Sequence, residues 1–269
     1  MAKSEDLARI IEAVPVFTIN SLITSTDTDM YRRQRPSSMF GIFQDIAAAH
    51  ARNLGADVRW LREELDLAWI LMRIRLEIDS YPMLGQELMV DTWPQEPRAL
   101  YERDYVIREA DGKTLARAAS TWIIMNLSTR EIKRDRFLDY KGVETKKERA
   151  IEGGVARLKP VDGAETVYEK KIRFSDVDYN WHANNAKYVD FIMDVFPIED
   201  YKKLEVKAIE VHYINEVGPG EDLFIRRKVL EEGCGPTDVE RKDYIDGVRV
   251  SDGSPVFNAL VEWRVAPVL

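Results

Sequence analysis

The sequence has very few of the side chains that form disulfides or bind transition metals. It contains one cysteine, Cys234, and three histidines among 269 residues. A single thiol cannot form an internal disulfide, and Cys234 lies in a Gly-Cys-Gly-Pro segment that is typical of a loop, so we interpret it as incidental. His50, His182 and His212 are scattered along the chain, so we expect no metal site and no cofactor.

Long apolar runs and an excess of positive charge are also missing. The longest apolar stretch, 67–72, is far too short to span a bilayer, and residues 1–12 mix acids and bases, unlike a signal peptide. The net charge of −8 argues against nucleic acid as a partner. We therefore expect a soluble, cytoplasmic protein without membrane insertion. Its oligomeric state is left open, and a homodimer is compatible with the sequence.

What the sequence does contain is an internal repeat. Asp111-Gly112 and Trp122 in the first half return 141 residues later as Asp252-Gly253 and Trp263. Upstream, Asp27-Thr28-Asp29 returns at an offset of 149 as Asp176-Val177-Asp178. Two related units that differ only by small loop insertions explain this pattern.

Each unit follows the order strand, helix and then several strands. Apolar residues at helical spacing precede Gly55 in the first unit, and a shorter helix follows Asn184-Asn185 and stops near Pro197 in the second. Runs rich in β-branched and aromatic residues then predict strands at 69–80, 87–93, 101–109, 114–125, 206–215, 222–231, 237–245 and 255–265, after first strands at 16–24 and 166–174. The Asp-Gly pairs predict hairpin turns, so the expected class is α+β with antiparallel sheets.

The unit boundary is predicted in a polar segment. Gly153-Gly154 and a run of charges interrupt every apolar period there. We accordingly divide the chain into an N-terminal module at 1–140, a linker at 141–163 and a C-terminal module at 164–269. With 45% hydrophobic residues, the chain can bury two cores or one fused core.

The segment before the second helix carries the most specific chemistry. Asp176, Asp178, Asn180 and His182 alternate along it, so an extended conformation would place them on one side, next to the free amides of a helix start. An acid, an amide and an imidazole beside helix amides can activate water and stabilise an oxyanion. This combination indicates a hydrolase.

The run Asp178-Tyr179-Asn180-Trp181-His182-Ala183-Asn184-Asn185-Ala186-Lys187-Tyr188 closely resembles the signature of the acyl-acyl carrier protein thioesterases, whose plant members end fatty-acid synthesis. Segments 44–55, 72–78 and 122–126 are also similar to that family. The resemblance implies a tandem hotdog fold, in which each module is a long helix packed on a curved antiparallel sheet. It further implies hydrolysis of fatty acyl-acyl carrier protein (acyl-ACP), with release of a free fatty acid.

The resemblance also implies the site residues. The family's catalytic carboxylate falls on Glu216, so the implied catalytic set is Asp178, Asn180, His182 and Glu216. Val217 stands where plant enzymes carry a cysteine, which leaves water as the attacking group. The expected substrate-binding residues, at the helix start and in an acyl pocket of the first module, are Asn184, Asn185, Met39, Phe43, Trp69 and Met72. His50 and His212 are expected to be packed in the core.

An acidic protein needs a local basic patch to bind an acidic carrier protein. The expected docking residues are Arg32, Arg33 and Arg35 with Lys187, and Lys202 and Lys203 are second candidates. Three alternatives stay open: a coenzyme A thioesterase, a hotdog dehydratase or hydratase, and a non-enzymatic acyl-binding or sensor protein. The sequence gives neither the acyl chain length nor which carboxylate acts as base.

Overall fold

The computed structural model describes residues 12–98, 100–133, 138, 140–233 and 239–267. Their strands form one continuous antiparallel sheet in the order β1-β3-β4-β5-β2-β8-β11-β10-β9-β7, with β6 paired to β5. The first half supplies β1 (Phe17–Leu22), β2 (Leu67–Ile78), β3 (Glu87–Pro94), β4 (Tyr101–Arg108), β5 (Thr114–Asn126) and β6 (Ile132–Lys133). The second half supplies β7 (Glu165–Lys171), β8 (Leu204–Tyr213), β9 (Asp222–Glu232), β10 (Arg241–Arg249) and β11 (Pro255–Val265).

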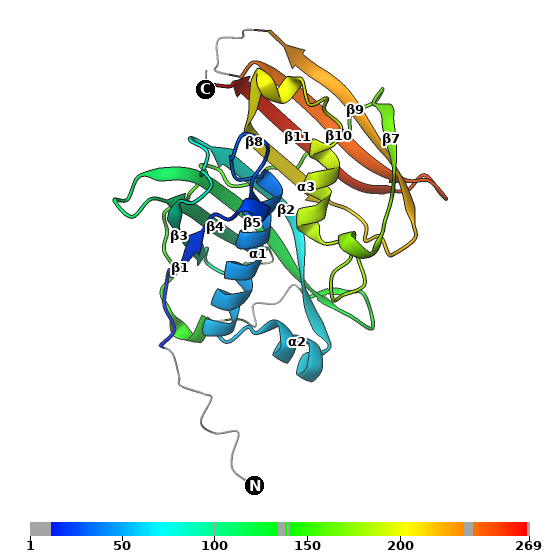
Figure 1. Ribbon diagram of the computed structural model, residues 1–269. Coiled ribbons are helices and arrows are strands. Elements are labelled where there is room, and N and C mark those ends of the chain that lie inside the picture. The colour runs from blue at the N-terminus through cyan, green and yellow to red at the C-terminus, as the bar shows by residue number, and fades with distance from the viewer. Residues whose placement is uncertain (1–11, 99, 134–137, 139, 234–238, 268–269) are drawn as a thin grey trace.

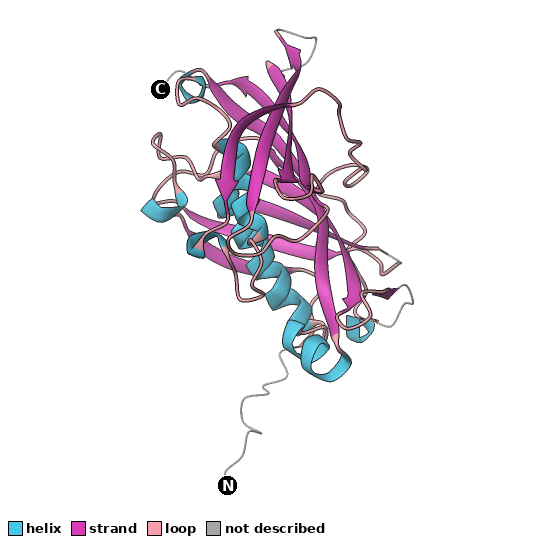
Figure 2. Ribbon diagram, turned by 90° about the vertical axis from the view of Figure 1, so that its right-hand side faces the viewer, coloured by secondary structure: helices cyan, strands magenta, loops and turns pink. Residues whose placement is uncertain are grey.

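The helices lie on one face of this curved sheet (Figures 1 and 2). They are α1 (Pro36–Asn53), α2 (Val58–Leu65) and α3 (Asn185–Met193). The longest, α1, begins with a proline at its first position, where the missing N–H costs nothing, and buries Met39, Phe40, Phe43, Ile46 and His50 along one stripe. The helix α3 repeats this arrangement in the second half and buries Tyr188, Val189, Phe191 and Ile192.

The two halves are joined through their central strands. β2 pairs with β8 over Arg73–Glu77, and β2 and β8 also pair with β5 and β11 of their own halves. One hydrophobic core therefore runs across both halves, from Ile23 near β1 to Trp263 in β11. The fused core is the second of the two possibilities that the composition allows.

The α+β class and the tandem hotdog arrangement are confirmed. The hairpins at Asp111-Gly112 and Asp252-Gly253 connect antiparallel partners, β4 with β5 and β10 with β11. The repeat brings α1 and α3 onto equivalent positions of the sheet (Figure 1). In the described part of the chain, no helix is both long and apolar enough to cross a membrane.

Candidate active site

The segment with Asp178, Asn180 and His182 is a tight turn, and the extended conformation expected from the alternation is wrong. The Asp178 N–H donates to the His182 carbonyl at 2.9 Å, and the Trp181 N–H donates to the Asp178 carbonyl at 3.1 Å. Trp181 has a φ of 64°, and the Asp178 carboxylate accepts from the Asn180 N–H at 2.8 Å. An aspartate that bonds the backbone two residues ahead stabilises such turns, which local alternation cannot reveal. We call 178–182 the catalytic loop, after the predicted catalytic residues that it contains.

The catalytic loop leads directly into α3. Asn184 caps this helix, because its side chain accepts from the Ala186 N–H at 2.8 Å. The next side chain, Asn185, donates from Nδ2 to Gln44 Oε1 of α1 at 3.3 Å. The start of α3 is thus tied to the middle of α1, and the positive end of the α3 dipole lies beside the loop.

His182 lies next to Glu216, which follows β8. Their Nε2 and Oε2 atoms are 3.8 Å apart, and the two side chains are 40% and 38% exposed. Glu216 Oε2 also pairs with Arg130 Nη2 at 3.1 Å, and the Glu216 carbonyl accepts from Arg249 Nη2 at 2.8 Å. The structure therefore joins the predicted histidine and carboxylate, and Arg249 fixes the backbone of the carboxylate.

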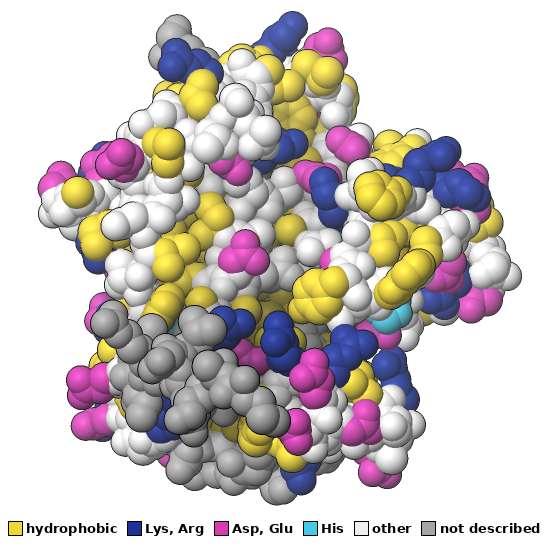
Figure 3. Space-filling model, turned by 60° about the horizontal axis from the view of Figure 1, so that its bottom comes forward, with side chains coloured by type: hydrophobic (Ala, Val, Ile, Leu, Met, Phe, Trp, Pro, Cys, Tyr) yellow, Lys and Arg dark blue, Asp and Glu magenta, His cyan; other side chains and the backbone are white. Residues whose placement is uncertain are grey.

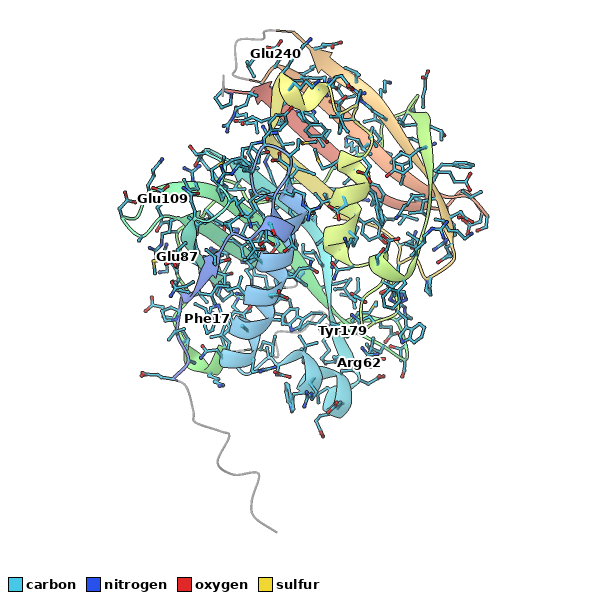
Figure 4. All side chains as sticks on the ribbon, in the orientation of Figure 1. Phe17, Arg62, Glu87, Glu109, Tyr179 and Glu240 are labelled. Carbon is cyan, nitrogen blue, oxygen red and sulfur yellow. The ribbon has the colours of Figure 1, made fainter. Side chains whose placement is uncertain are left out.

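Asn180 is held from the first half of the chain. Arg62 of α2 donates from Nη1 to Asn180 Oδ1 at 2.8 Å. Figure 4 shows Arg62 close to Tyr179, the residue before Asn180 in the loop, at the lower end of the molecule between α2 and the start of α3. Two arginines of the first half, Arg62 and Arg130, thus contact two predicted catalytic residues of the second half.

The catalytic loop opens into a hollow of about 330 Å³ that follows α1. We call it the α1 hollow. It is lined by Gly41, Gln44, Asp45, Ala47, Ala48, Ala51, Ala56, Val58, Trp69, Pro94, Tyr101, Glu102, Arg103, Trp122, Tyr140, Asp178, Tyr179, Asn180, Asn184 and Asn185. The small α1 side chains leave this space open. Figure 3, which brings the lower end of the molecule forward, shows a hollowed face with apolar side chains and, along one edge, Lys and Arg interspersed with Asp and Glu.

The lining corrects half of the predicted acyl-binding set. Trp69, Asn184 and Asn185 line the α1 hollow, whereas Met39, Phe43 and Met72 are not among its lining residues. Met39 and Phe43 are fully buried on the stripe of α1 that faces the core, one helical face away from Gln44 and Ala48. The β2–β5 register shifts between Leu71 and Arg73, so Met72 is the extra residue of a bulge.

A buried arginine forms part of the hollow's wall. Arg103 Nη1 donates to His50 Nδ1 at 3.0 Å and to Thr92 Oγ1 at 3.3 Å, and His50 Nε2 donates to the Val14 carbonyl at 2.8 Å. Burial and the nearby Arg103 charge lower the pKa of His50 to about 4. His50 is therefore the core histidine that the sequence predicts, and in its neutral form it holds Arg103 against the hollow.

Two other titratable side chains, Asp45 and His212, lie outside the loop. Asp45 of α1 lines the α1 hollow, and burial raises the pKa of its carboxyl. His212 is confirmed as a core residue: it is buried in β8, and its Nε2 donates to Glu210 Oε1 at 2.7 Å. Among the residues that the structure describes, no group of three or more His, Cys, Asp or Glu side chains is placed to hold a metal ion.

The first half contains the same loop without the predicted catalytic side chains. The Asp29 N–H donates to the Arg33 carbonyl at 2.8 Å, and Arg32 has a φ of 66°, as in the catalytic loop. Arg33 occupies the place of His182, and Tyr81 occupies that of Glu216. Arg33 pairs with Asp29 at 2.9 Å and with Glu205 at 3.5 Å. The duplicated site has become an ionic contact between the two halves.

This finding removes Arg33 from the predicted docking patch. Its side chain is 8% exposed and its charge is already paired, so a partner protein cannot reach it. Arg32 is exposed, and Arg35 is exposed with Nη2 bonded to the Thr26 carbonyl. Both lie at the start of α1, at the opposite end of the helix pair from the catalytic loop (Figure 1). Lys187 is partly exposed and pairs with Asp190 of the same helix.

Comparison with known proteins places the chain in a family. Residues 15–136 match the acyl-ACP thioesterase N-terminal domain, and residues 161–263 match the C-terminal domain of the same family. A palmitoyl-acyl carrier protein thioesterase of Arabidopsis thaliana is 26% identical over 96% of this chain, and an oleoyl-acyl carrier protein thioesterase of the same plant is 27% identical over 72%. The chain spans 66% and 58% of these two proteins.

Solved structures share the fold. An acyl-ACP thioesterase from Bacteroides thetaiotaomicron has a TM-score of 0.80 at 24% identity, over 93% of this chain and 98% of that one. The 12:0-ACP thioesterase from Umbellularia californica has a TM-score of 0.81 at 21% identity, over 93% and 94%. Because the two domain matches cover most of the sequence, the chain belongs to the acyl-ACP thioesterase family.

Proposed function

We propose that this protein hydrolyses the thioester of fatty acyl-ACP and releases a free fatty acid. The observation that carries the proposal is the position of the His182–Glu216 pair in the loop that opens into the α1 hollow. The names of the plant relatives, palmitoyl- and oleoyl-acyl carrier protein thioesterases, support the substrate class. The hollow is at the small end of the volumes usual for ligand pockets, which suits one narrow chain.

In this proposal water is the nucleophile. The 3.8 Å gap between His182 Nε2 and Glu216 Oε2 is too long for a direct hydrogen bond and leaves room for a water that contacts both groups. One of them takes the proton as the water oxygen attacks the thioester carbon. The C–S bond of the tetrahedral intermediate then breaks, and the proton passes to the departing thiolate. General-base assistance of this kind contributes about 10²–10⁴-fold.

The start of α3 supplies the electrostatic stabilisation. The N–H groups of Ala186 and Lys187 donate to Asn184, so we assign the Asn185 N–H, at the first position of the helix, to the developing oxyanion. Arg62 donates to Asn180 Oδ1, and we assign the side-chain N–H groups of Asn180 to the thioester carbonyl or the water. Asp178 shapes the loop through its bond to the Asn180 backbone, and we assign it this orienting role.

The proposed partner is an acyl carrier protein. Arg32, Arg35 and Lys187 remain candidates for the docking patch after the removal of Arg33. We add Arg62, which contacts the catalytic loop, and Arg59 of the same helix, because both are exposed on α2. Charges at the edge of an interface act mainly on encounter with the partner.

The proposal is tested by free-thiol release from acyl-ACP. Wild-type protein should release thiol and fatty acid in equal amounts, and Glu216→Gln should lower turnover at least about a hundredfold. Glu87→Gln is the matched control, because Glu87 is exposed on β3, well away from the site in Figure 4. Absence of thiol release by the wild type, or equal turnover in both folded variants, would refute the proposal.

A further inference from the structure

A tyrosine and a glutamate separate the α1 hollow from a second hollow. The second one, of about 730 Å³, lies outside β4 and includes Leu138, Val143 and Arg149. We call it the linker hollow. Tyr140 and Glu102 line both hollows, so they form the wall between them.

Tyr140 lies at the far end of the α1 hollow from the catalytic loop. Gln44 of α1 contacts Asn185 beside the loop, and the Asn53 carbonyl of α1 accepts from Lys141 Nζ at 2.8 Å. Gln44 and Asn53 are nine residues apart on one helix, which corresponds to about 13 Å. An acyl chain that enters at the catalytic loop and follows α1 therefore ends against Tyr140.

The barrier is firmly held. Tyr140 is 5% exposed and packs in the cluster that contains Leu54, Tyr101 and Leu138. Burial raises the pKa of its phenol, so the ring stays neutral. Its φ of 49° lies in the left-handed region, which costs energy for a residue with a side chain. The chain keeps a large ring in an unfavourable backbone conformation at this one point of the wall.

The rest of the wall is charged. Glu102 forms an ion pair with Arg149, which also lines the linker hollow and contacts Asp104 at 3.5 Å. A paired carboxylate resists the passage of an alkyl chain because the pair would have to be desolvated or separated. Apolar side chains lie beyond it at Leu138 and Val143. Removal of the Tyr140 ring would thus connect two spaces with partly apolar walls.

We propose that Tyr140 closes the distal end of the acyl site and sets the longest acyl chain that the protein accepts. The proposal rests on the proposed function and assigns a specificity role to the last residue of the N-terminal module. Tyr140 is a wall residue and takes no part in the chemistry, so its loss changes the preferred chain length and leaves the attack of water intact.

The test is Tyr140→Gly, assayed by thiol release from carrier proteins with acyl chains of graded length. Glycine removes the ring and also suits the left-handed backbone, which limits the structural cost. For each protein, kcat/KM is measured for the wild-type optimal chain and for a chain two carbons longer, and the second value is divided by the first. This ratio should be at least about tenfold higher in Tyr140→Gly than in wild type, because each buried methylene favours binding by about fourfold. Tyr140→Phe keeps the ring and should leave the length profile unchanged.

A second readout separates this proposal from the proposed function. Displacement of a fluorescent fatty acid by free fatty acids of graded length measures the site without catalysis, and Tyr140→Gly should bind longer acids than wild type does. If wild type releases no thiol, the hydrolase proposal fails while the binding profiles still test the barrier. Unchanged profiles in folded Tyr140→Gly would overturn the barrier. Should truncation unfold the chain, Tyr140→Trp tests the same role through a shift to shorter chains, and an unchanged profile there would also overturn it.

Discussion

The buried His50–Arg103 contact predicts how stability depends on pH. Burial and the Arg103 charge lower the pKa of His50 from 6.5 to about 4. Above pH 6.5 the imidazole is neutral in both the folded and the unfolded chain, so its contribution is constant. Below pH 6.5 the unfolded chain takes up a proton that the folded chain does not, so stability is lost as the pH falls towards 4.

The size of the loss follows from the shift. One pKa unit corresponds to about 1.4 kcal/mol, so the free energy of unfolding should fall by about 2 kcal/mol between pH 7 and pH 5 through His50 alone. His50→Gln cannot titrate, and its amide can both accept from Arg103 and donate to the Val14 carbonyl. The variant should be less stable than wild type at pH 7, and the difference should shrink by about 2 kcal/mol at pH 5.

Urea unfolding at pH 7, 6 and 5 measures both proteins, and the difference between them cancels the titration of the carboxylates that they share. The slope of free energy against urea concentration should be equal in the two proteins, which shows that the same surface is exposed. A stability difference that stays constant from pH 7 to pH 5 would refute the assignment of His50 as a neutral, buried acceptor for Arg103.

Three further predictions concern the reaction. His182→Ala should lower kcat at least about a hundredfold without unfolding the chain, measured by thiol release and circular dichroism, and near-normal kcat would remove His182 from the mechanism. The double variant Arg32→Glu with Arg35→Glu should raise the KM for acyl-ACP and leave the KM for acyl-coenzyme A unchanged. Added salt should raise the wild-type KM for acyl-ACP towards that of the variant, and equal effects of the variant on both substrates would exclude this docking patch. Cys234, which lies outside the described residues, is not used by the proposed mechanism, so Cys234→Ser should keep nearly full activity; loss of activity would revive a covalent mechanism.

The strands were predictable because their pattern is local. Runs rich in β-branched and aromatic residues predicted 255–265, which is β11, and placed the other strands within a few residues, except for the two-residue β6, which was not predicted. The helix α2 was missed: it has only eight residues, four of them charged, and although Val58, Leu61 and Leu65 recur at helical spacing, only Leu61 is buried. A local signal was present in Asp57, whose side chain caps the helix by accepting from Arg59 and Trp60 N–H groups.

The site was only partly predictable, because several of its contacts join distant residues. The motif pointed to His182, and the family resemblance implied Glu216; the structure brings the two side chains together. The bond from Arg62 to Asn180 spans 118 residues and that from Arg130 to Glu216 spans 86, so no local pattern indicates them. The α1 stripe was read as a pocket lining, yet its large side chains fill the core and the alanines beside them leave the space open.

The most direct test of the central claim is a single turnover of acyl-ACP with excess enzyme, quenched in acid and followed by intact mass spectrometry. Attack by water predicts that the carrier protein loses the acyl mass, that free fatty acid appears at the same rate, and that the enzyme mass stays unchanged throughout. An enzyme species carrying the acyl mass, formed and consumed at the rate of turnover, would contradict the account, as would a carrier protein that keeps its acyl group.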